Sequence, residues 1–292
     1  MVRNEENMSD YAVRGITHDG YVRFFGVNAP ETVQKAIDLH YLSIINSVVM
    51  GRLLLSGLLI GAGLKNEDDL LTIRIDGDGP SGVVLVTTTG KGTIKGYVEN
   101  PQIELRMTDK GFAVAEAVGS GTLSVIRSIG DNPAYTGQIE LVSGEIGDDL
   151  SYYFKQSEQI DTIVNLGILV SPQAKIIQAG GILVQCMPDT PDELLEILDK
   201  NAQKFPNLSD IMDMGYSVEQ MLTQFIFKEI PIQFLDKNDV CYKCDCNRER
   251  FLNGIKLLGK EEIQEIINSD EPLMAECHFC GLKYEFDKGE LT

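Results

Sequence analysis

Two closely spaced pairs of cysteines near the C-terminus constrain this chain more than any other feature of its sequence. Cys244 and Cys246 form the first pair, and Cys277 and Cys280 form the second. Zinc binds four thiolates tetrahedrally, and one short turn of backbone can present two of them. The pattern therefore predicts one zinc ion per chain, held by these four sulfur atoms. The first pair has one intervening residue where an ordinary zinc ribbon has two, so the site departs from the common ribbon.

Three other residues bear on the ligand set. Cys241 stands three residues before Cys244, so it is a spare thiol, an alternative ligand or a partner in disulfide exchange. His278 lies inside the second pair and could replace a thiolate, but the backbone geometry of adjacent ligands disfavours this. Cys186 follows an apolar run, and we expect a small buried core residue there rather than a reactive thiol.

The formal net charge of -19 narrows the range of partners. Such a surface repels phosphate backbones and anionic membranes, and it keeps a protein soluble while apolar surface is exposed. Residues 1–10 are polar, and the apolar stretch 53–64 is too short to cross a bilayer. We therefore expect a cytoplasmic protein that binds neither nucleic acid nor membranes. In that compartment clustered cysteines indicate metal or redox chemistry rather than structural disulfides.

Hydrophobic periodicity and composition divide the chain into three parts. Residues 1–187 combine many strands with one long helix over 29–64, without regular β-α-β alternation, which predicts an α+β domain. Residues 188–238 are rich in acidic side chains and carry helical patterns. They are either a linker that folds by docking on a neighbour or an ordinary helical extension of the first domain. Residues 239–292 form a small cysteine module whose stability must come largely from a metal.

The expected elements follow from the same patterns. Strands are expected within 11–28 and at 71–75, 82–89, 93–98, 121–128, 138–142, 167–170, 181–186 and 282–286. Further helices are expected at 146–159, 191–201 and 218–227, and between the two cysteine pairs.

No motif in the sequence supports catalysis. Residues 77–82 match the dinucleotide fingerprint, but a β-branched strand follows where phosphate binding requires a helix, so we expect a tight hairpin. His18, His40 and His278 form no spaced set, and no nucleophile motif is present. We therefore expect a protein that is not an enzyme.

Motifs along the whole chain form a recognisable set. They lie at residues 51–54, 58–61, 77–82, 95–101, 136–150, 152–159, 166–170, 179–185, 244–250 and 277–280. Together they resemble the redox-regulated heat-shock protein 33 family of bacterial chaperones, with Tyr-Tyr-Phe-Lys-Gln-Ser-Glu-Gln at 152–159 and the cysteine set as the most specific parts. Departures are small: Lys95 replaces a frequent arginine, Asp161 replaces a frequent proline, and Cys241 is additional.

The resemblance implies an ATP-independent holdase of the stress response with three parts: a β-rich N-terminal domain for clients and dimerisation, a metastable helical linker, and a zinc domain. The reduced, zinc-bound form would be largely inactive. Oxidation with unfolding stress would release zinc and form the disulfides Cys244–Cys246 and Cys277–Cys280. The linker would then loosen, and the protein would dimerise and hold unfolding clients until it is reduced and transfers them to an ATP-driven foldase.

Two alternative functions would also involve these cysteines. A zinc-ribbon nucleic-acid or adaptor protein is disfavoured because acidic residues outnumber basic ones between Cys246 and Cys277. A thiol–disulfide oxidoreductase using Cys277 and Cys280 is disfavoured because no thioredoxin-like β-α-β pattern surrounds that pair.

Overall fold

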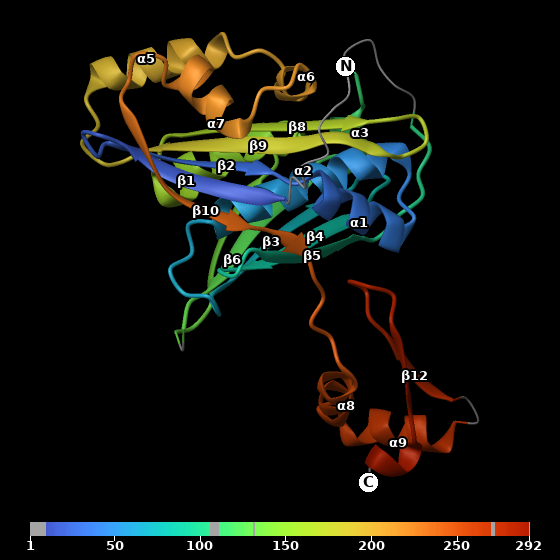
Figure 1. Ribbon diagram of the computed structural model, residues 1–292. Helices are drawn as coiled ribbons and strands as arrows, with labels where there is room; N and C mark the ends of the chain where they lie inside the picture. The colour runs from blue at the N-terminus through green and yellow to red at the C-terminus, as the bar shows by residue number, and fades with distance from the viewer. Residues whose placement is uncertain (1–9, 106–110, 131, 270–271, 292) are drawn as a thin grey trace. The chain divides into compact units, whose positions relative to one another are not determined.

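The computed structural model describes residues 10–105, 111–130, 132–269 and 272–291 (Figure 1). Contacts divide the chain into two compact units, Met1–Tyr242 and Lys243–Thr292. Residues 1–9, which carry most of the polar N-terminal segment discussed above, lie outside the described residues. Within the described ranges the chain is a mixed α and β protein with several sheets.

The first unit contains two large sheets. A five-stranded antiparallel sheet has the order β10-β1-β2-β9-β8, and a six-stranded sheet has the order β11-β5-β4-β3-β6-β7. Their bounds are β1 Tyr11–Thr17, β2 Val22–Asn28, β3 Leu70–Gly77, β4 Val83–Thr89, β5 Thr93–Val98, β6 Gly121–Ser128, β7 Tyr135–Glu140, β8 Thr162–Val170, β9 Ile176–Cys186, β10 Ile232–Asp239 and β11 Cys241–Tyr242. The turn at residues 77–82 leads from β3 into β4 and not into a helix, as the sequence predicted.

The predicted long helix is two helices, α1 Pro30–His40 and α2 Ile44–Gly61. Tyr41 adopts a left-handed conformation with φ 51°, which ends α1. The Ser43 side chain then accepts a hydrogen bond from the backbone N–H of Asn46 and caps the start of α2. The prediction of one continuous helix was wrong, because apolar spacing continues across a break that only the backbone conformation reveals.

Helix α2 is the central core helix of the first unit. Among the described residues it alone has the length and hydropathy to cross a membrane, but 89% of that window is buried inside the protein. It packs against strands of both sheets, and Figure 1 shows it between them. Burial, rather than the short length expected from sequence, therefore identifies this segment as core. The smaller elements α3 Val114–Val118 and α4 Gly147–Tyr153, with its π-helical continuation η1 Phe154–Glu158, complete this part.

Residues 188–238 belong to the first unit in this structure. Their helices are α5 Asp192–Gln203, α6 Leu208–Asp213 and α7 Val218–Met221, which continues as the π-helical turn η2 Leu222–Ile226. They lie on the outer side of the five-stranded sheet (Figure 1), and we call them the docked helices. Sequence patterns predicted α5 and α7 but missed α6 and the edge strand β10. The unit boundary falls after Tyr242 because Val240 and Tyr242 are buried in the first unit's core.

The second unit is small. It contains α8 Arg248–Lys256, α9 Lys260–Asn268, the hairpin of β12 Leu273–Glu276 and β13 Lys283–Phe286, and the 3-10 turn η3 Lys288–Leu291. Among its described residues only Cys277, Phe286 and Leu291 are buried, and neither α8 nor α9 buries a single residue. So few buried side chains leave this unit dependent on another source of stability.

Candidate metal centre and docked helices

The four paired cysteines come together in the second unit. The sulfur atoms of Cys244, Cys246, Cys277 and Cys280 all lie within 4.8 Å of one another. The distance between the Cys244 and Cys277 sulfurs is 3.7 Å, and that between the Cys246 and Cys280 sulfurs is 3.4 Å. Tetrahedral zinc with bonds of about 2.3 Å places its sulfur ligands about 3.8 Å apart. The donor set and its spacing therefore fit one zinc ion.

Local backbone structure presents each pair. Cys277 follows β12 and accepts, through its carbonyl, the backbone N–H groups of Cys280 and Gly281 at 3.3 and 2.7 Å. Gly281 has φ +70°, a conformation that glycine adopts without strain, and the chain then returns as β13. The first pair immediately precedes α8, whose N-cap Asn247 accepts a hydrogen bond from the Arg250 backbone N–H at 2.9 Å. A hairpin turn and a helix start thus fix the two ligand pairs.

One aromatic side chain contacts the cysteine group, and other aromatic and charged contacts lie elsewhere in the second unit. The Tyr284 hydroxyl lies 3.2 Å from the Cys246 sulfur, and the Tyr284 ring packs on Phe251 with centroids 5.1 Å apart. Arg248 binds both carboxylate oxygens of Glu290, and this holds the pKa of Glu290 down at about 2. The Arg248 guanidinium also lies over the Phe286 ring, 4.7 Å from its centre. The contact of Tyr284 with Cys246 is of the kind that orients a metal ligand.

The thiols have divergent acidities. Burial, supported by hydrogen bonds to neighbouring thiols, raises the pKa of Cys280 to about 11 and also raises the pKa of Cys244. Burial opposes ionisation of Cys246 too, but hydrogen bonds from Tyr284 and the other thiols outweigh it and lower the pKa of this thiol. Four adjacent thiolates repel one another, so a cation is required to ionise all of them together.

The remaining cysteines and His278 are not part of this group of four. Cys241 is exposed in β11 of the first unit, where its backbone N–H donates to the Gly92 carbonyl at 3.1 Å. Cys186 is half-buried at the end of β9 and packs against the apolar residues beneath the docked helices. Burial, followed by the charges of Asp161 and Asp199, raises the pKa of the Cys186 thiol to about 11, which leaves it protonated at neutral pH.

The docked helices cover an apolar face of the five-stranded sheet. The sheet residues of this covered face are Tyr11, Val13, Val22, Phe24, Ile182 and Val184. The helix residues that pack on it include Val218, Met221, Leu222, Ile226 and Phe227. The rings of Phe24 and Phe227 lie 5.0 Å apart. This second apolar cluster is separate from the main core around α2.

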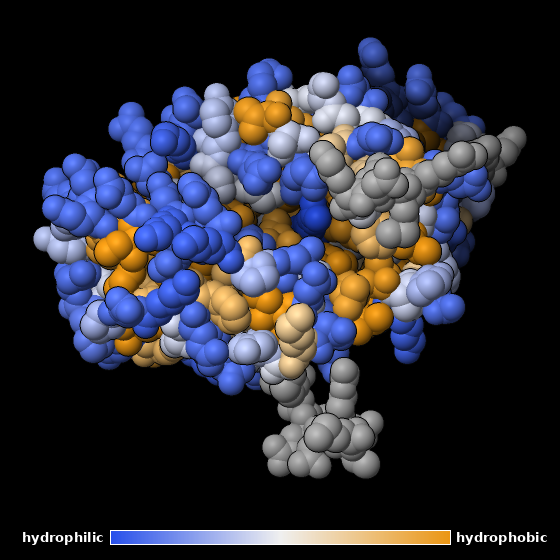
Figure 2. Space-filling view, turned by 90° about the horizontal axis from the view of Figure 1, so that it is seen from above, coloured by the Kyte–Doolittle hydropathy of each residue, from blue (hydrophilic) through white to orange (hydrophobic). Residues whose placement is uncertain are grey.

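The outer side of the docked helices is mainly hydrophilic. Figure 2 looks onto this side and shows small hydrophobic patches among polar side chains. The sheet residues of the covered face are buried beneath these helices, so this face is hidden from solvent in this structure.

Two polar contacts of Glu219 tie α7 to the sheet. The Tyr11 hydroxyl donates a hydrogen bond to Glu219 at 2.9 Å, and the Lys237 ammonium lies 2.9 Å from the other carboxylate oxygen of Glu219. The same ammonium lies 3.6 Å from the centre of the Tyr11 ring. No local sequence pattern predicts the trio of Tyr11, Glu219 and Lys237, because Tyr11 is far from the other two in the chain.

Comparisons with known proteins cover almost the whole chain. A family model described as Hsp33 protein matches residues 10–287. The chain is 39% identical over 285 residues to a 33 kDa chaperonin of Desulforamulus reducens, covering 97% of this chain and 96% of the relative. It is 40% identical to a 33 kDa chaperonin of Geobacillus kaustophilus, with 97% of both chains covered. Among solved structures, the 33 kDa chaperonin of Thermotoga maritima matches with a TM-score of 0.87 and 34% identity, over 97% of this chain and 96% of that one.

Proposed function

Because the chain belongs to the Hsp33 protein family, we propose that it is a redox-regulated, ATP-independent holdase chaperone. The observation that carries the proposal is the gathering of four cysteine sulfurs in a unit with almost no apolar core. A metal at this site would be the main source of stability for the second unit. Oxidation of its cysteine ligands would therefore release the metal and unfold this unit. The relatives are named chaperonins, which favours this function over a zinc-ribbon adaptor or an oxidoreductase.

In the reduced state, Cys244, Cys246, Cys277 and Cys280 hold one zinc ion. These residues would bind the ion as thiolates, and the ion would join the start of the second unit to the turn between β12 and β13. Cys241 is an accessory thiol outside the ligand set, because it is exposed in β11 of the first unit.

In the oxidised state the same cysteines form the disulfides Cys244–Cys246 and Cys277–Cys280. Each pair of thiolates gives two electrons to one hydrogen peroxide molecule: the S–S bond forms, the O–O bond breaks, and two protons from solvent complete two water molecules. Sulfurs joined in disulfides no longer coordinate zinc, so the second unit unfolds. Exchange with a dithiol reductant reverses the change.

The covered face of the five-stranded sheet is the proposed client surface. When the docked helices leave it, Phe24 and its apolar neighbours become available to unfolding proteins. We propose that the active form is a homodimer that holds clients until an ATP-driven foldase receives them. The net charge of -19 keeps such complexes dispersed in the cytoplasm.

A client aggregation assay tests this function. The reduced, zinc-loaded chain should leave light scattering by a thermally unfolding client nearly unchanged, whereas the peroxide-treated chain should suppress it without ATP. Equal suppression by both forms would refute redox control. Suppression by neither would refute the holdase function.

Glu219→Gln should loosen α7 without disturbing the metal centre. Burial opposes ionisation of Glu219, but hydrogen bonds from Lys237 and Tyr11 outweigh it and lower the pKa of this carboxyl. The charge therefore stabilises docking above the unfolded-state pKa of Glu219, and this contribution is lost as pH falls through the lower folded-state value. We expect faster amide exchange at residues 218–227, which corresponds to a fall of about 1 kcal/mol in the free energy that holds α7 on the sheet at pH 7.

The control is Glu196→Gln, an exposed carboxylate on α5, which should exchange like the wild type. The Glu219→Gln effect should shrink at acidic pH, where the wild-type carboxyl is itself protonated. An effect that is the same at pH 7 and below the folded-state pKa would contradict the ion-pair explanation.

A further inference from the structure

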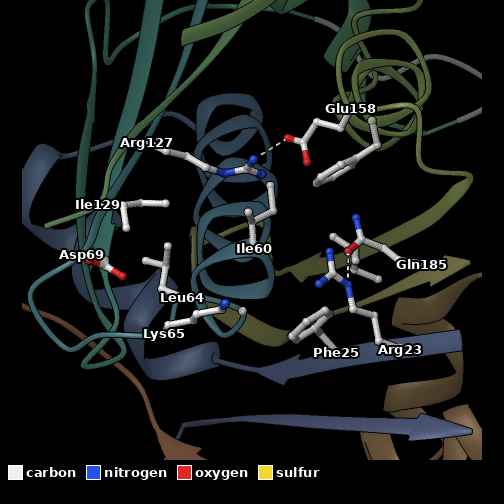
Figure 3. A pocket seen from close by; sticks show the side chains of 13 residues that line it. Arg23, Phe25, Ile60, Leu64, Lys65, Asp69, Arg127, Ile129, Glu158 and Gln185 are labelled. Carbon is white, nitrogen blue, oxygen red and sulfur yellow. Dashed lines mark hydrogen bonds and ion pairs between the residues drawn. The ribbon is translucent and has the colours of Figure 1, made fainter. Parts of the chain in front are cut away.

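The first unit contains a cavity of about 300 Å³ between its two sheets, beside the C-terminal end of α2 (Figure 3). Arg23 and Phe25 reach it from β2, Leu183 and Gln185 from β9, and Arg127 from β6. Its volume is at the lower end of that found for small-molecule sites. Buried apolar side chains form part of its wall, so it is more than a groove in a polar surface.

This cavity lies on the opposite face of β2 and β9 from the docked helices. Successive residues of a strand point to opposite faces, so Phe24 faces the helices while Arg23 and Phe25 face the cavity. The same alternation holds on β9, where Val184 packs under the helices and Leu183 lines the cavity. Occupation of the cavity therefore does not compete with the proposed client surface.

Positive groups exceed negative groups around the cavity, although the chain as a whole is strongly acidic. Arg23, Lys65 and Arg127 line it together with Asp69 and Glu158. Each carboxylate is bound to a partner other than Arg23. Glu158 pairs with Arg127 at 2.7 Å, and Asp69 accepts hydrogen bonds from the backbone N–H groups of residues 66 and 130.

Arg23 has no such carboxylate partner among the described residues. Its Nε donates to the Gln185 side-chain oxygen at 2.8 Å, and Figure 3 shows its guanidinium at the cavity. Gln185 is uncharged, and the nearby Glu158 carboxylate, which is paired with Arg127, offsets the Arg23 charge only in part. Burial lowers the pKa of Arg23, which reports the cost of holding this charge away from water. A bound anion would offset that cost and accept the remaining guanidinium hydrogen bonds.

We propose that the cavity binds a small organic anion, a monocarboxylate with a short apolar tail, through the guanidinium of Arg23. The tail lies against Phe25, Ile60 and Leu183, which are all buried apolar residues. A monocarboxylate suits the lining because the three cations and two carboxylates leave one net positive charge. The neighbouring Glu158 carboxylate disfavours a ligand with two negative charges.

Hexanoate is the probe, titrated into the reduced, zinc-loaded full chain and followed by calorimetry and by the methyl NMR signals of Ile60 and Leu183. We expect saturable binding that shifts both signals. Hexan-1-ol has the same tail without the charge, and sulfate has charge without the tail. The affinity of each should be at least roughly ten-fold lower than that of hexanoate. Equal binding of hexan-1-ol would overturn the proposal in favour of an apolar gap. Tighter binding of sulfate would overturn the monocarboxylate assignment.

Variants assign the binding to Arg23. Arg23→Gln should weaken hexanoate binding roughly ten-fold or more, and Arg23→Lys should fall between it and the wild type, because lysine keeps the charge but not the two-pronged geometry. The matched control is Arg74→Gln, since Arg74 on β3 pairs with Asp76 and does not line the cavity. Absence of saturable hexanoate binding to the wild type, or equal losses in Arg23→Gln and Arg74→Gln, would overturn the proposal.

Discussion

Met221→Asp is expected to make the reduced, zinc-loaded chain an active holdase without oxidation. Met221 is fully buried between the docked helices and the sheet. A carboxylate buried there without a partner would cost about 3–5 kcal/mol, enough to displace a few short helices. The main core around α2 is a separate cluster, so the two sheets should remain folded. The readout is client light scattering under reducing conditions, with bound zinc measured in the same preparation.

Met214→Asp is the matched control, because Met214 follows α6 in the same segment but is 76% exposed. It should behave like the wild type in both measurements. Suppose that Met221→Asp releases the helices, as shown by fast amide exchange at residues 218–227, yet leaves client aggregation unchanged. The covered face would then not be the client surface.

Cys277→Ser is expected to abolish stable zinc binding and unfold the second unit. Cys277 is 3% exposed and is one of only three buried residues in the described part of that unit. Structural zinc supplies roughly 10–16 kcal/mol of apparent binding free energy in small zinc domains. A whole domain has a net stability of only about 5–15 kcal/mol, so loss of the metal exceeds what this small core can supply. Zinc content per chain and amide exchange across the described residues 243–269 and 272–291 measure both effects.

Cys241→Ser provides the comparison for this prediction. Its side chain is exposed and lies outside the group of four, so this variant should retain one zinc ion and a protected second unit. Zinc loss in Cys241→Ser, with zinc retained in Cys277→Ser, would reassign the ligand set. A second unit of Cys277→Ser that stays protected without zinc would contradict the metal's role in its fold.

Local chemistry made the cysteine group predictable from sequence. Two short turns that each carry two thiols need few other contacts to meet at a metal, and the structure brings all four sulfurs together. Alternating patterns likewise placed β3 to β6 correctly, because one face of each strand is buried.

Other features depended on backbone conformation or on contacts between distant residues. The left-handed Tyr41 divides a helix whose apolar spacing continues through Leu42 and Ile45. Strand β10 is mostly exposed at a sheet edge, so its sequence is as polar as that of a linker, and only its pairing with β1 identifies it as a strand. The contact of Glu219 with Tyr11 and the approach of Arg23 to Gln185 join residues from opposite parts of the chain, and no local pattern encodes them.

The most direct measurement follows three signals in one sample during peroxide oxidation: released zinc, amide exchange at residues 218–227, and suppression of client aggregation. If loss of the metal frees the docked helices and uncovers the sheet, all three should change together and reverse together on reduction in the presence of zinc. Full zinc release and full chaperone activity with residues 218–227 still protected would contradict this coupling.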